Sequence, residues 1–143
     1  MKIIVLNGSP KGELSITMQS VAYLANIFPQ HEFKIQHIVQ RFGRLEKNQE
    51  AFTDVIDQVW SADAVLWGFP LYILHVHGYY KRFIELISER NVKDAFKGKY
   101  TASLSTSIHF FDHTAHNYIH GICDDLEMRF VVSFTADMHD LLN

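Results

Sequence analysis

The amino-acid sequence predicts an α/β protein in which helices cover both faces of a doubly wound, five-stranded parallel sheet, giving three α/β/α layers. Strand-like and helix-like patterns alternate along all 143 residues, and no repeat, low-complexity segment or linker interrupts them. Residues 64–69 are apolar on both alternating faces, as in a central strand between two helical layers. Because the 48% hydrophobic content suits one core, residues 1–143 are expected to form a single domain.

The amino-terminal part of the chain predicts a strand, a helix and a second strand. Residues 3–6 are an unbroken apolar run, which is typical of a buried strand. The helix that follows is expected to end near Pro29, before a short strand at about residues 33–38. Apolar residues at helical spacing form the expected buried stripe of that helix, namely Met18, Val21, Ala22 and Ala25.

The middle of the chain contains the clearest helical pattern. This pattern spans residues 52–60, and the strand at residues 64–69 follows it and stops at Pro70. Apolar residues recur in the helical segment with the spacing of one buried face, at Phe52, Val55, Ile56, Val59 and Trp60.

Two further βα units complete the predicted order. A third helix turns Tyr80 and Phe83 inward and precedes a strand at about residues 100–105, and a fourth helix leads to a last strand at about residues 130–134. The inward residues expected on the fourth helix are Ala115, Tyr118, Ile119, Ile122, Cys123 and Leu126.

Few residues follow the last predicted strand. Folds of this kind close with one more helix, yet only residues 137–143 remain, so the sheet is expected to lack or truncate that helix. One apolar sheet face would then be uncovered. Two alternatives are open: a second subunit covers it in a homo-oligomer, or the chain is part of a longer protein.

The segment after the first strand predicts an anion site. Asn-Gly-Ser-Pro-Lys-Gly at residues 7–12 leads to a helix that opens near Ser15. Hydroxyls, an ammonium group and the amides of a helix N-terminus suit a phosphate at the carboxyl end of a strand. The spacing matches neither the triphosphate nor the dinucleotide fingerprint. The alternative is a tight turn followed by an ordinary helix cap.

Composition bounds the other function classes. A formal net charge of -3 with scattered Lys and Arg argues against nucleic-acid binding. No apolar run is long enough to span a membrane and no signal-peptide pattern opens the chain, so a cytoplasmic protein is expected. The single cysteine, Cys123, rules out an internal disulfide or cysteine-ligated cluster and is interpreted as a buried thiol. No Gly-x-Ser-x-Gly elbow is present, and no side chain is assigned as catalytic.

Two segments resemble a known family. Residues 7–17 are similar to the phosphate loop of NADPH-dependent FMN reductases and related iron–sulfur flavoproteins, which have a flavodoxin-like fold. Phe-Pro-Leu-Tyr at residues 69–72, followed by Tyr-Lys-Arg-Phe-Ile-Glu at 80–85, is similar to the segment after their third strand. The resemblance covers the first two thirds of the chain and implies FMN as cofactor.

The resemblance also implies which residues contact FMN. The third loop departs from the glycine-rich sequence of many relatives, so its assignment is positional. The phosphate residues would be Ser9, Lys11, Ser15, Ile16 and Thr17; the ring-side residues would be Pro70, Leu71, Tyr72 and Ile73; the third-loop residues would be Ser105, Thr106, Ser107 and His109, with Phe110 or Phe111 as a wall.

Histidines suggest a second kind of site. On the fourth helix, His113, His116 and His120 could share one face with His109 nearby, which is compatible with a metal site. A solvated or subunit-contacting helix face is favoured instead, because no acidic or cysteine ligand completes the pattern. No metal is therefore expected. His75 and His77 lie near the expected flavin edge and could contact substrate or be ordinary loop residues.

The resemblance implies an FMN-dependent oxidoreductase whose flavin accepts hydride from NAD(P)H and passes electrons to an unknown small-molecule or protein acceptor. Two alternatives remain open from the sequence. One is an FMN-binding electron-transfer domain of a larger redox protein, and the other is a flavin-free flavodoxin-like domain that serves assembly.

Overall fold

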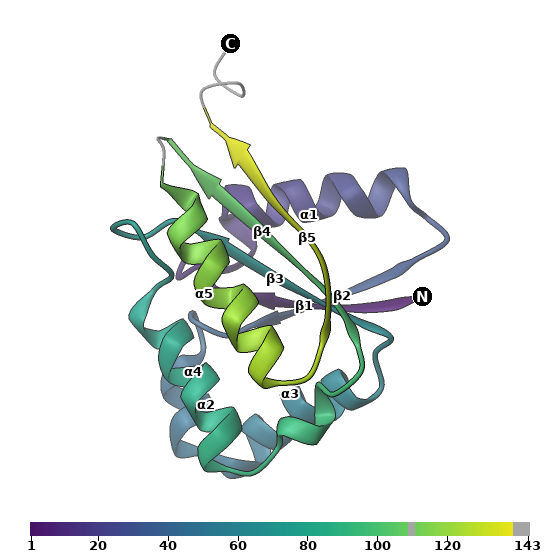
Figure 1. Ribbon diagram of the computed structural model, residues 1–143, viewed down its shortest axis with the longest axis vertical. Coiled ribbons are helices and arrows are strands. Elements are labelled where there is room, and N and C mark those ends of the chain that lie inside the picture. Colours follow the sequence, from purple (N-terminus) through teal and green to yellow (C-terminus); the bar gives the residue numbers. More distant parts are fainter. Residues whose placement is uncertain (109–110, 139–143) are drawn as a thin grey trace.

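The computed structural model describes residues 1–108 and 111–138 and contains the predicted five-stranded sheet (Figure 1). Its strands are β1 (Lys2–Asn7), β2 (Glu32–His37), β3 (Ala64–Pro70), β4 (Tyr100–Ser107) and β5 (Arg129–Asp137). All neighbouring strands are parallel, in the order β2-β1-β3-β4-β5. This is the flavodoxin-like doubly wound order, and it confirms the predicted fold class.

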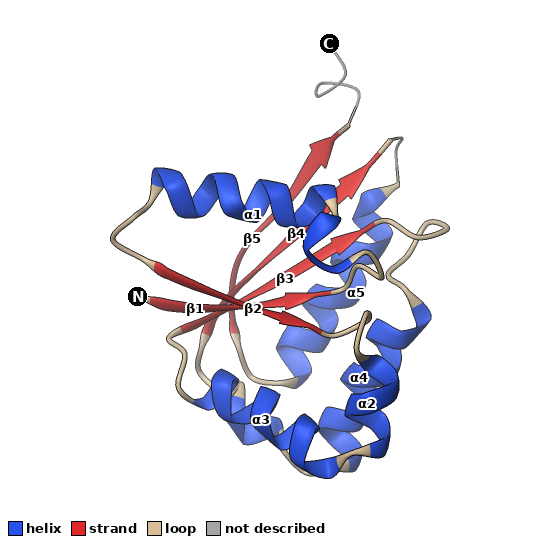
Figure 2. Ribbon diagram, turned by 180° about the vertical axis from the view of Figure 1, so that it is seen from behind, coloured by secondary structure: helices blue, strands red, loops and turns tan. Residues whose placement is uncertain are grey.

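The helices are divided unequally between the two faces of the sheet (Figure 2). The first helix covers one face alone, and the other four form the opposite layer. They are α1 (Ile16–Ile27), α2 (Phe42–Lys47), α3 (Gln49–Trp60), α4 (Gly78–Glu89) and α5 (Asp112–Asp125). The sequence analysis predicted four of them. It missed α2, because six residues are too few for a periodic pattern.

The core of the four-helix layer is built from aromatic side chains on β3, α4 and the segment before β4. Trp67 stacks on Phe96 with ring centroids 6.0 Å apart, and its indole donates to the Thr101 hydroxyl at 3.0 Å. The buried Tyr80 hydroxyl donates to the Leu6 carbonyl oxygen at 2.6 Å. These bonds satisfy the polar atoms that the burial of large rings takes out of water.

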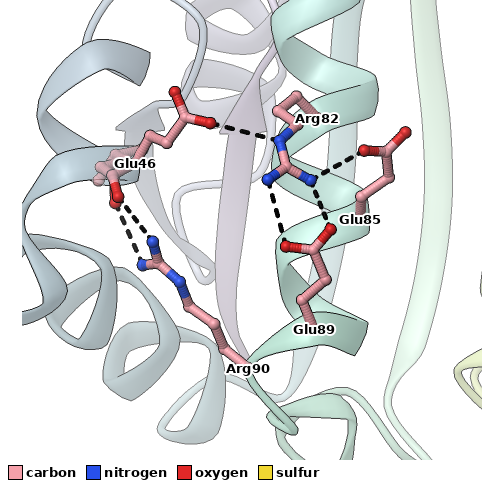
Figure 3. Close-up of polar contacts among 6 residues, drawn as sticks. Glu46, Arg82, Glu85, Glu89 and Arg90 are labelled. Carbon is pink, nitrogen blue, oxygen red and sulfur yellow. Dashed lines mark hydrogen bonds and ion pairs between the residues drawn. The ribbon is translucent and has the colours of Figure 1, made fainter.

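A cluster of charged residues ties α2 to α4 on the outside of this layer (Figure 3). The Arg82 guanidinium contacts the Glu46, Glu85 and Glu89 carboxylates, which hold its pKa above the ordinary value for arginine. Arg90 donates to the Glu46 carbonyl oxygen at 2.7 Å, so it caps the C-terminal turn of α2. The cluster therefore has a structural role.

Two predictions of burial were wrong. Trp60, expected on the buried stripe, is 55% exposed, because it is the last residue of α3 and lies where the chain turns toward β3. Ala22 is exposed because α1 buries a narrower stripe, with Met18 and Val21 at its centre. A lone helix on a sheet face contacts it along one line, so fewer helical positions are covered.

The strands reach further than their patterns indicated. β4 continues to Ser107 and β5 spans nine residues, Arg129–Asp137. In the described part of the chain, no helix follows β5, and the sheet face beside α1 is bare at its β5 side (Figure 2). None of the described helices has the length and hydropathy of a membrane span.

Candidate cofactor site

The loop between β1 and α1 is held from below by Asn7, a fully buried residue at the end of β1. Its Nδ2 donates to the Gly12 carbonyl oxygen at 3.2 Å and contacts His37 Nδ1 at 2.9 Å, and its Oδ1 accepts the Ser9 amide at 2.9 Å. One side chain thus fixes both ends of the loop. The sequence analysis assigned no role to Asn7, although its place directly after a buried strand was a usable signal.

Close packing also fixes the shape of this loop. Gly12 has φ +58°, and a Cβ there would overlap the Gln40 carboxamide. A Cβ at Gly8 would lie 3.0 Å from Phe69 Cβ. Both positions therefore favour glycine, one for its backbone angle and one for the close approach of β3.

Donor groups gather where this loop enters α1. Ser15 is the N-cap, and its Oγ accepts the Met18 amide at 3.2 Å. The Gln19 amide donates to the Ser15 carbonyl oxygen, whereas the amides of Ile16 and Thr17 have no backbone acceptor among the described residues. Unpaired amides at a helix start are the donors that bind anions.

Two other predicted phosphate residues, Ser9 and Lys11, belong to the same loop. Ser9 is buried, and its Oγ accepts the Lys11 amide at 3.2 Å, which leaves the hydroxyl hydrogen available to donate. Lys11 is exposed at the rim of the loop. The five predicted residues therefore all lie in the one segment that follows the carboxyl end of β1.

The segment after β3 forms a tight turn on the same edge of the sheet. Tyr72 and His75 exchange two backbone hydrogen bonds, of 2.6 Å and 3.2 Å. The two residues between them, Ile73 and Leu74, have φ of +48° and +64°. Such angles suit Asn-Gly and are strained for a β-branched residue, so this turn stores strain beside the site.

The side chains of this turn face outward. Ile73 is 85% exposed, and the half-exposed Tyr72 ring lies 4.9 Å from the His77 ring. His77 caps α4 by accepting the Tyr79 amide, whereas the His75 ring packs edge-on against Tyr118. Burial and the Lys81 charge lower the pKa of His75, which favours its neutral form. An aromatic face and two apolar side chains are thus presented at the strand end.

Thr106 on β4 joins the two loops. Its Oγ1 lies 2.7 Å from Thr17 Oγ1 at the start of α1, and its carbonyl oxygen accepts the Leu71 amide at 2.9 Å. The predicted phosphate-side segment and the predicted ring-side segment are distant in sequence, and both are hydrogen-bonded to Thr106.

Ser105 and Ser107 turn to the opposite side of β4 and bind Asp112 at the start of α5. Their hydroxyls donate to the two Asp112 carboxylate oxygens at 2.5 Å and 2.6 Å. Both side chains are buried, so they stabilise the junction of β4 and α5. His109 and Phe110 lie outside the described residues, and Phe111 is an exposed residue with φ +83°.

His116 corrects the expectation of a solvated histidine face on the fourth helix. It is buried, with Nδ1 2.7 Å from Ser103 Oγ and Nε2 2.9 Å from Ser105 Oγ. Because Ser105 donates to Asp112, it accepts from His116 Nε2–H, which fixes the tautomer. Burial lowers the pKa of His116 against the opposing effect of Asp112. His120 is exposed, so the two imidazoles have different surroundings.

A model of the NADPH-dependent FMN reductase family matches residues 1–136. The chain belongs to this family. Membership identifies the protein as an FMN-dependent enzyme with a reduced nicotinamide as electron donor. A comparison with curated proteins gave no match.

Solved structures similar to this reductase share its fold at low sequence identity. An NADH:FMN oxidoreductase in its apo form has a TM-score of 0.72 and 20% identity, over 94% of this chain and 74% of that one. A flavoenzyme NAD(P)H:(acceptor) oxidoreductase from Paracoccus denitrificans has a TM-score of 0.72 and 19% identity, over 91% and 74%. General stress protein 14 from Treponema denticola, in complex with FMN, has a TM-score of 0.74 and 11% identity, over 99% and 88%.

The donor set of this FMN reductase fits a phosphate group. The Ile16 and Thr17 amides lie at the positive end of the α1 dipole, and the Ser9 hydroxyl and the Lys11 ammonium group are close in sequence to them. No carboxylate belongs to the predicted phosphate set, and Glu13 in the same loop is directed to His37 at 3.6 Å. A dianion is thus compatible with the charges and donors of the loop.

Proposed function

We propose that this FMN reductase holds the FMN phosphate with residues 9–17 and aligns the isoalloxazine ring along residues 70–73, within one FMN-binding domain over residues 1–143. The observation that carries the proposal is the pair of α1 amides, Ile16 and Thr17, that have no backbone acceptor among the described residues and follow a loop already fixed by Asn7 and Gly12. A site formed before the ligand arrives loses little entropy on binding.

The proposed chemistry belongs to the flavin, and the chain supplies binding and orientation. Bound FMN would accept hydride from NAD(P)H and deliver electrons to a small-molecule or protein acceptor. The described residues place no buried carboxylate at the turn of residues 72–75, so the chain's contribution there is the aromatic face of Tyr72 and the apolar side chains of Ile73 and Leu74.

The decisive variant combines Ser9→Asp with Thr17→Val, which places a negative charge beside the phosphate and removes one hydroxyl. We expect the FMN dissociation constant to rise roughly 100-fold, because like charges repel and a donor is lost. Quenching of flavin fluorescence on titration measures it. Riboflavin, which has the ring and no phosphate, should bind the variant and the original protein equally.

Ser20→Ala is the matched control, since it removes a hydroxyl one turn further along α1 that donates to the Ile16 carbonyl oxygen at 3.2 Å. FMN affinity should be unchanged in this control. Equal loss of FMN and riboflavin in the double variant would indicate a damaged fold, and unchanged FMN affinity would refute the phosphate assignment. Anaerobic bleaching of bound flavin by NADPH or NADH then tests the nicotinamide reaction separately.

A further inference from the structure

Three hydrogen-bond donors from different elements lie together beside the turn of residues 72–75. The His75 ring is edge-on to the Tyr118 ring of α5, with centroids 4.8 Å apart. Lys81, near the start of α4, places its ammonium nitrogen 5.2 Å from the centre of the same Tyr118 ring. His75, Lys81 and Tyr118 therefore form a cluster around one aromatic ring, and only the tertiary structure brings them together.

The contacts of His75 fix which of its ring nitrogens donates. Nδ1 accepts the Val76 amide at 2.9 Å, so the hydrogen of the neutral ring is on Nε2. Burial and the Lys81 charge favour this neutral form. Among the described residues, Nε2 has no hydrogen-bond partner. The imidazole therefore presents one N–H to a ligand.

The other two donors of the cluster are also unpaired. In the described part of the chain, neither the Lys81 ammonium group nor the Tyr118 hydroxyl has an ion-pair or hydrogen-bond partner. Glu85, one turn along α4 from Lys81, contacts Arg82 at 3.0 Å instead. Burial and the Glu85 charge raise the pKa of Tyr118, so its hydroxyl keeps its hydrogen. All three groups are thus available as donors.

This donor set suits an anionic oxygen group. The cluster combines one positive charge on Lys81 with the neutral donors His75 Nε2 and the Tyr118 hydroxyl. A carboxylate has two oxygens that accept such bonds, and hydrogen bonds between charged groups are about twice as strong as those between neutral groups. A carboxylate therefore matches both the charge and the donors of the cluster.

The position of the cluster indicates which substrate would carry that carboxylate. His75 exchanges two backbone hydrogen bonds with Tyr72, which is one of the proposed ring-side residues. An anion at His75 would therefore be attached close to the ring that meets the flavin. The phosphates of NAD(P)H are separated from its nicotinamide by a ribose, whereas an aromatic carboxylate has its charge directly on the reacting ring. The electron acceptor is thus the better match.

We propose that His75, Lys81 and Tyr118 form a specificity site that binds the carboxylate of an aromatic electron acceptor. The inference rests on the proposed function and extends it to the class of acceptor. Lys81 supplies the charge, and His75 Nε2 and the Tyr118 hydroxyl supply directed hydrogen bonds. The half-exposed Tyr72 ring is available to the aromatic part of the same molecule.

The test compares 4-nitrobenzoate with 4-nitrobenzamide, which share the aromatic nitro group and differ in charge. Calorimetric titration into oxidised, FMN-loaded protein should give a dissociation constant roughly 10-fold lower for the carboxylate, because its bonds to Lys81 are charge-assisted. Lys81→Met should remove this preference, and methionine suits a helix, so the variant should keep its circular-dichroism spectrum. A Lys81→Met protein that retains the preference would overturn the proposal.

Two conservative variants separate the other donors from the packing of their rings. Tyr118→Phe keeps the ring and removes the hydroxyl. His75→Asn keeps an acceptor for the Val76 amide and removes Nε2–H. Each should reduce the preference for 4-nitrobenzoate roughly threefold and leave the affinity for 4-nitrobenzamide unchanged. Equal losses for the two compounds would indicate that these residues only pack, which contradicts the proposed role.

Lys93→Met is the matched control. It removes the same charge from an exposed lysine in the short helix Lys93–Ala95, which precedes β4 at the opposite edge of the sheet. The preference for 4-nitrobenzoate should persist in this control. If Lys93→Met and Lys81→Met lose it equally, net charge is responsible and the specificity site is refuted.

Flavin absorbance and its anaerobic bleaching by NADPH are recorded first, without either nitro compound. A protein that takes up no flavin would overturn the proposed function and this inference with it. A flavoprotein that NADPH bleaches, and that binds the two nitro compounds equally, would overturn the inference alone. Lys81→Met should not change the NADPH concentration needed for bleaching, and an increase would assign the cluster to the electron donor, against the proposal.

Discussion

The two ends of the proposed FMN site are built in opposite ways. The β1–α1 loop is fixed by side-chain hydrogen bonds from the buried Asn7, and it has glycine where the backbone requires it. The β3–α4 turn is exposed and holds Ile73 and Leu74 in left-handed conformations that suit glycine or asparagine. The phosphate end is therefore rigid and has little backbone strain. At the ring end, the backbone is strained where the turn presents its apolar side chains.

The difference indicates that the two ends of the proposed site have different roles. A phosphate is the same in every FMN-binding protein, so a fixed set of donors suffices to anchor it. The ring must meet a nicotinamide and then an acceptor, which requires an accessible and adjustable surface. Strain at Ile73 is consistent with that role, because strained residues persist where function requires them.

The largest effect is expected from Asn7→Ala, which should remove the rigidity of the phosphate end. Loss of the side chain leaves the buried Ser9 amide unpaired and the Gly12 carbonyl oxygen with the Ser15 amide alone, at 3.3 Å, which should cost about 2–3 kcal/mol of unfolding free energy. Urea denaturation measures it, and FMN affinity should fall with it. Asn48→Ala is the control, because Asn48 accepts one exposed amide as the α3 N-cap and should cost about 1 kcal/mol. Equal losses would contradict the comparison.

A smaller effect of opposite sign is expected at the ring end. Replacing Ile73 by Asn and Leu74 by Gly should stabilise the protein by about 1 kcal/mol, because the new residues suit the turn. Riboflavin affinity should decrease, since the apolar side chains are lost.

Glu127→Gly provides the control for that variant. Glu127 also has a positive φ, of +54°, and lies in the connection between α5 and β5. It should give a similar gain in thermal stability with no change in riboflavin binding. If the turn variant gains stability and keeps its flavin affinity, the strain has no role in the site.

The smallest expected effect is on the pH dependence of stability and concerns His116. This residue contacts Ser103 and Ser105 on β4, the strand that is bonded to both ends of the proposed site. Because burial lowers the pKa of His116, the native imidazole stays neutral at a pH where the unfolded one binds a proton. Stability should therefore be complete above pH 6.5, the ordinary histidine value, and decrease as the pH falls below it. His116→Gln should flatten that slope in pH-dependent denaturation. His120→Gln, at an exposed position, should retain it.

Local patterns predicted the elements well, with particular exceptions. The stripe of Phe52, Val55 and Val59 identified α3, because helical spacing reports burial within one element. The predicted burial of Trp60 and Ala22 was wrong, because burial also depends on where an element ends and on what packs against it. The predicted solvent exposure of His116 was wrong for a related reason. A polar side chain is buried only if hydrogen-bond partners satisfy it, and the partners of His116 are on β4 and β5.

By itself, the sequence determined the five strands, four of the five helices, and the family, and it predicted the phosphate loop with its glycines and hydroxyls, since each depends on residues adjacent in the chain. Tertiary structure alone decided that Thr17 contacts Thr106, 89 positions away, and that Ser105 and Ser107 donate to Asp112. It also decided that β5, with its exposed apolar side chains, is an edge strand of the sheet. The physical reason is the range of the forces. Propensity and periodicity act within a few residues, whereas hydrogen-bond satisfaction and burial depend on which strands become neighbours.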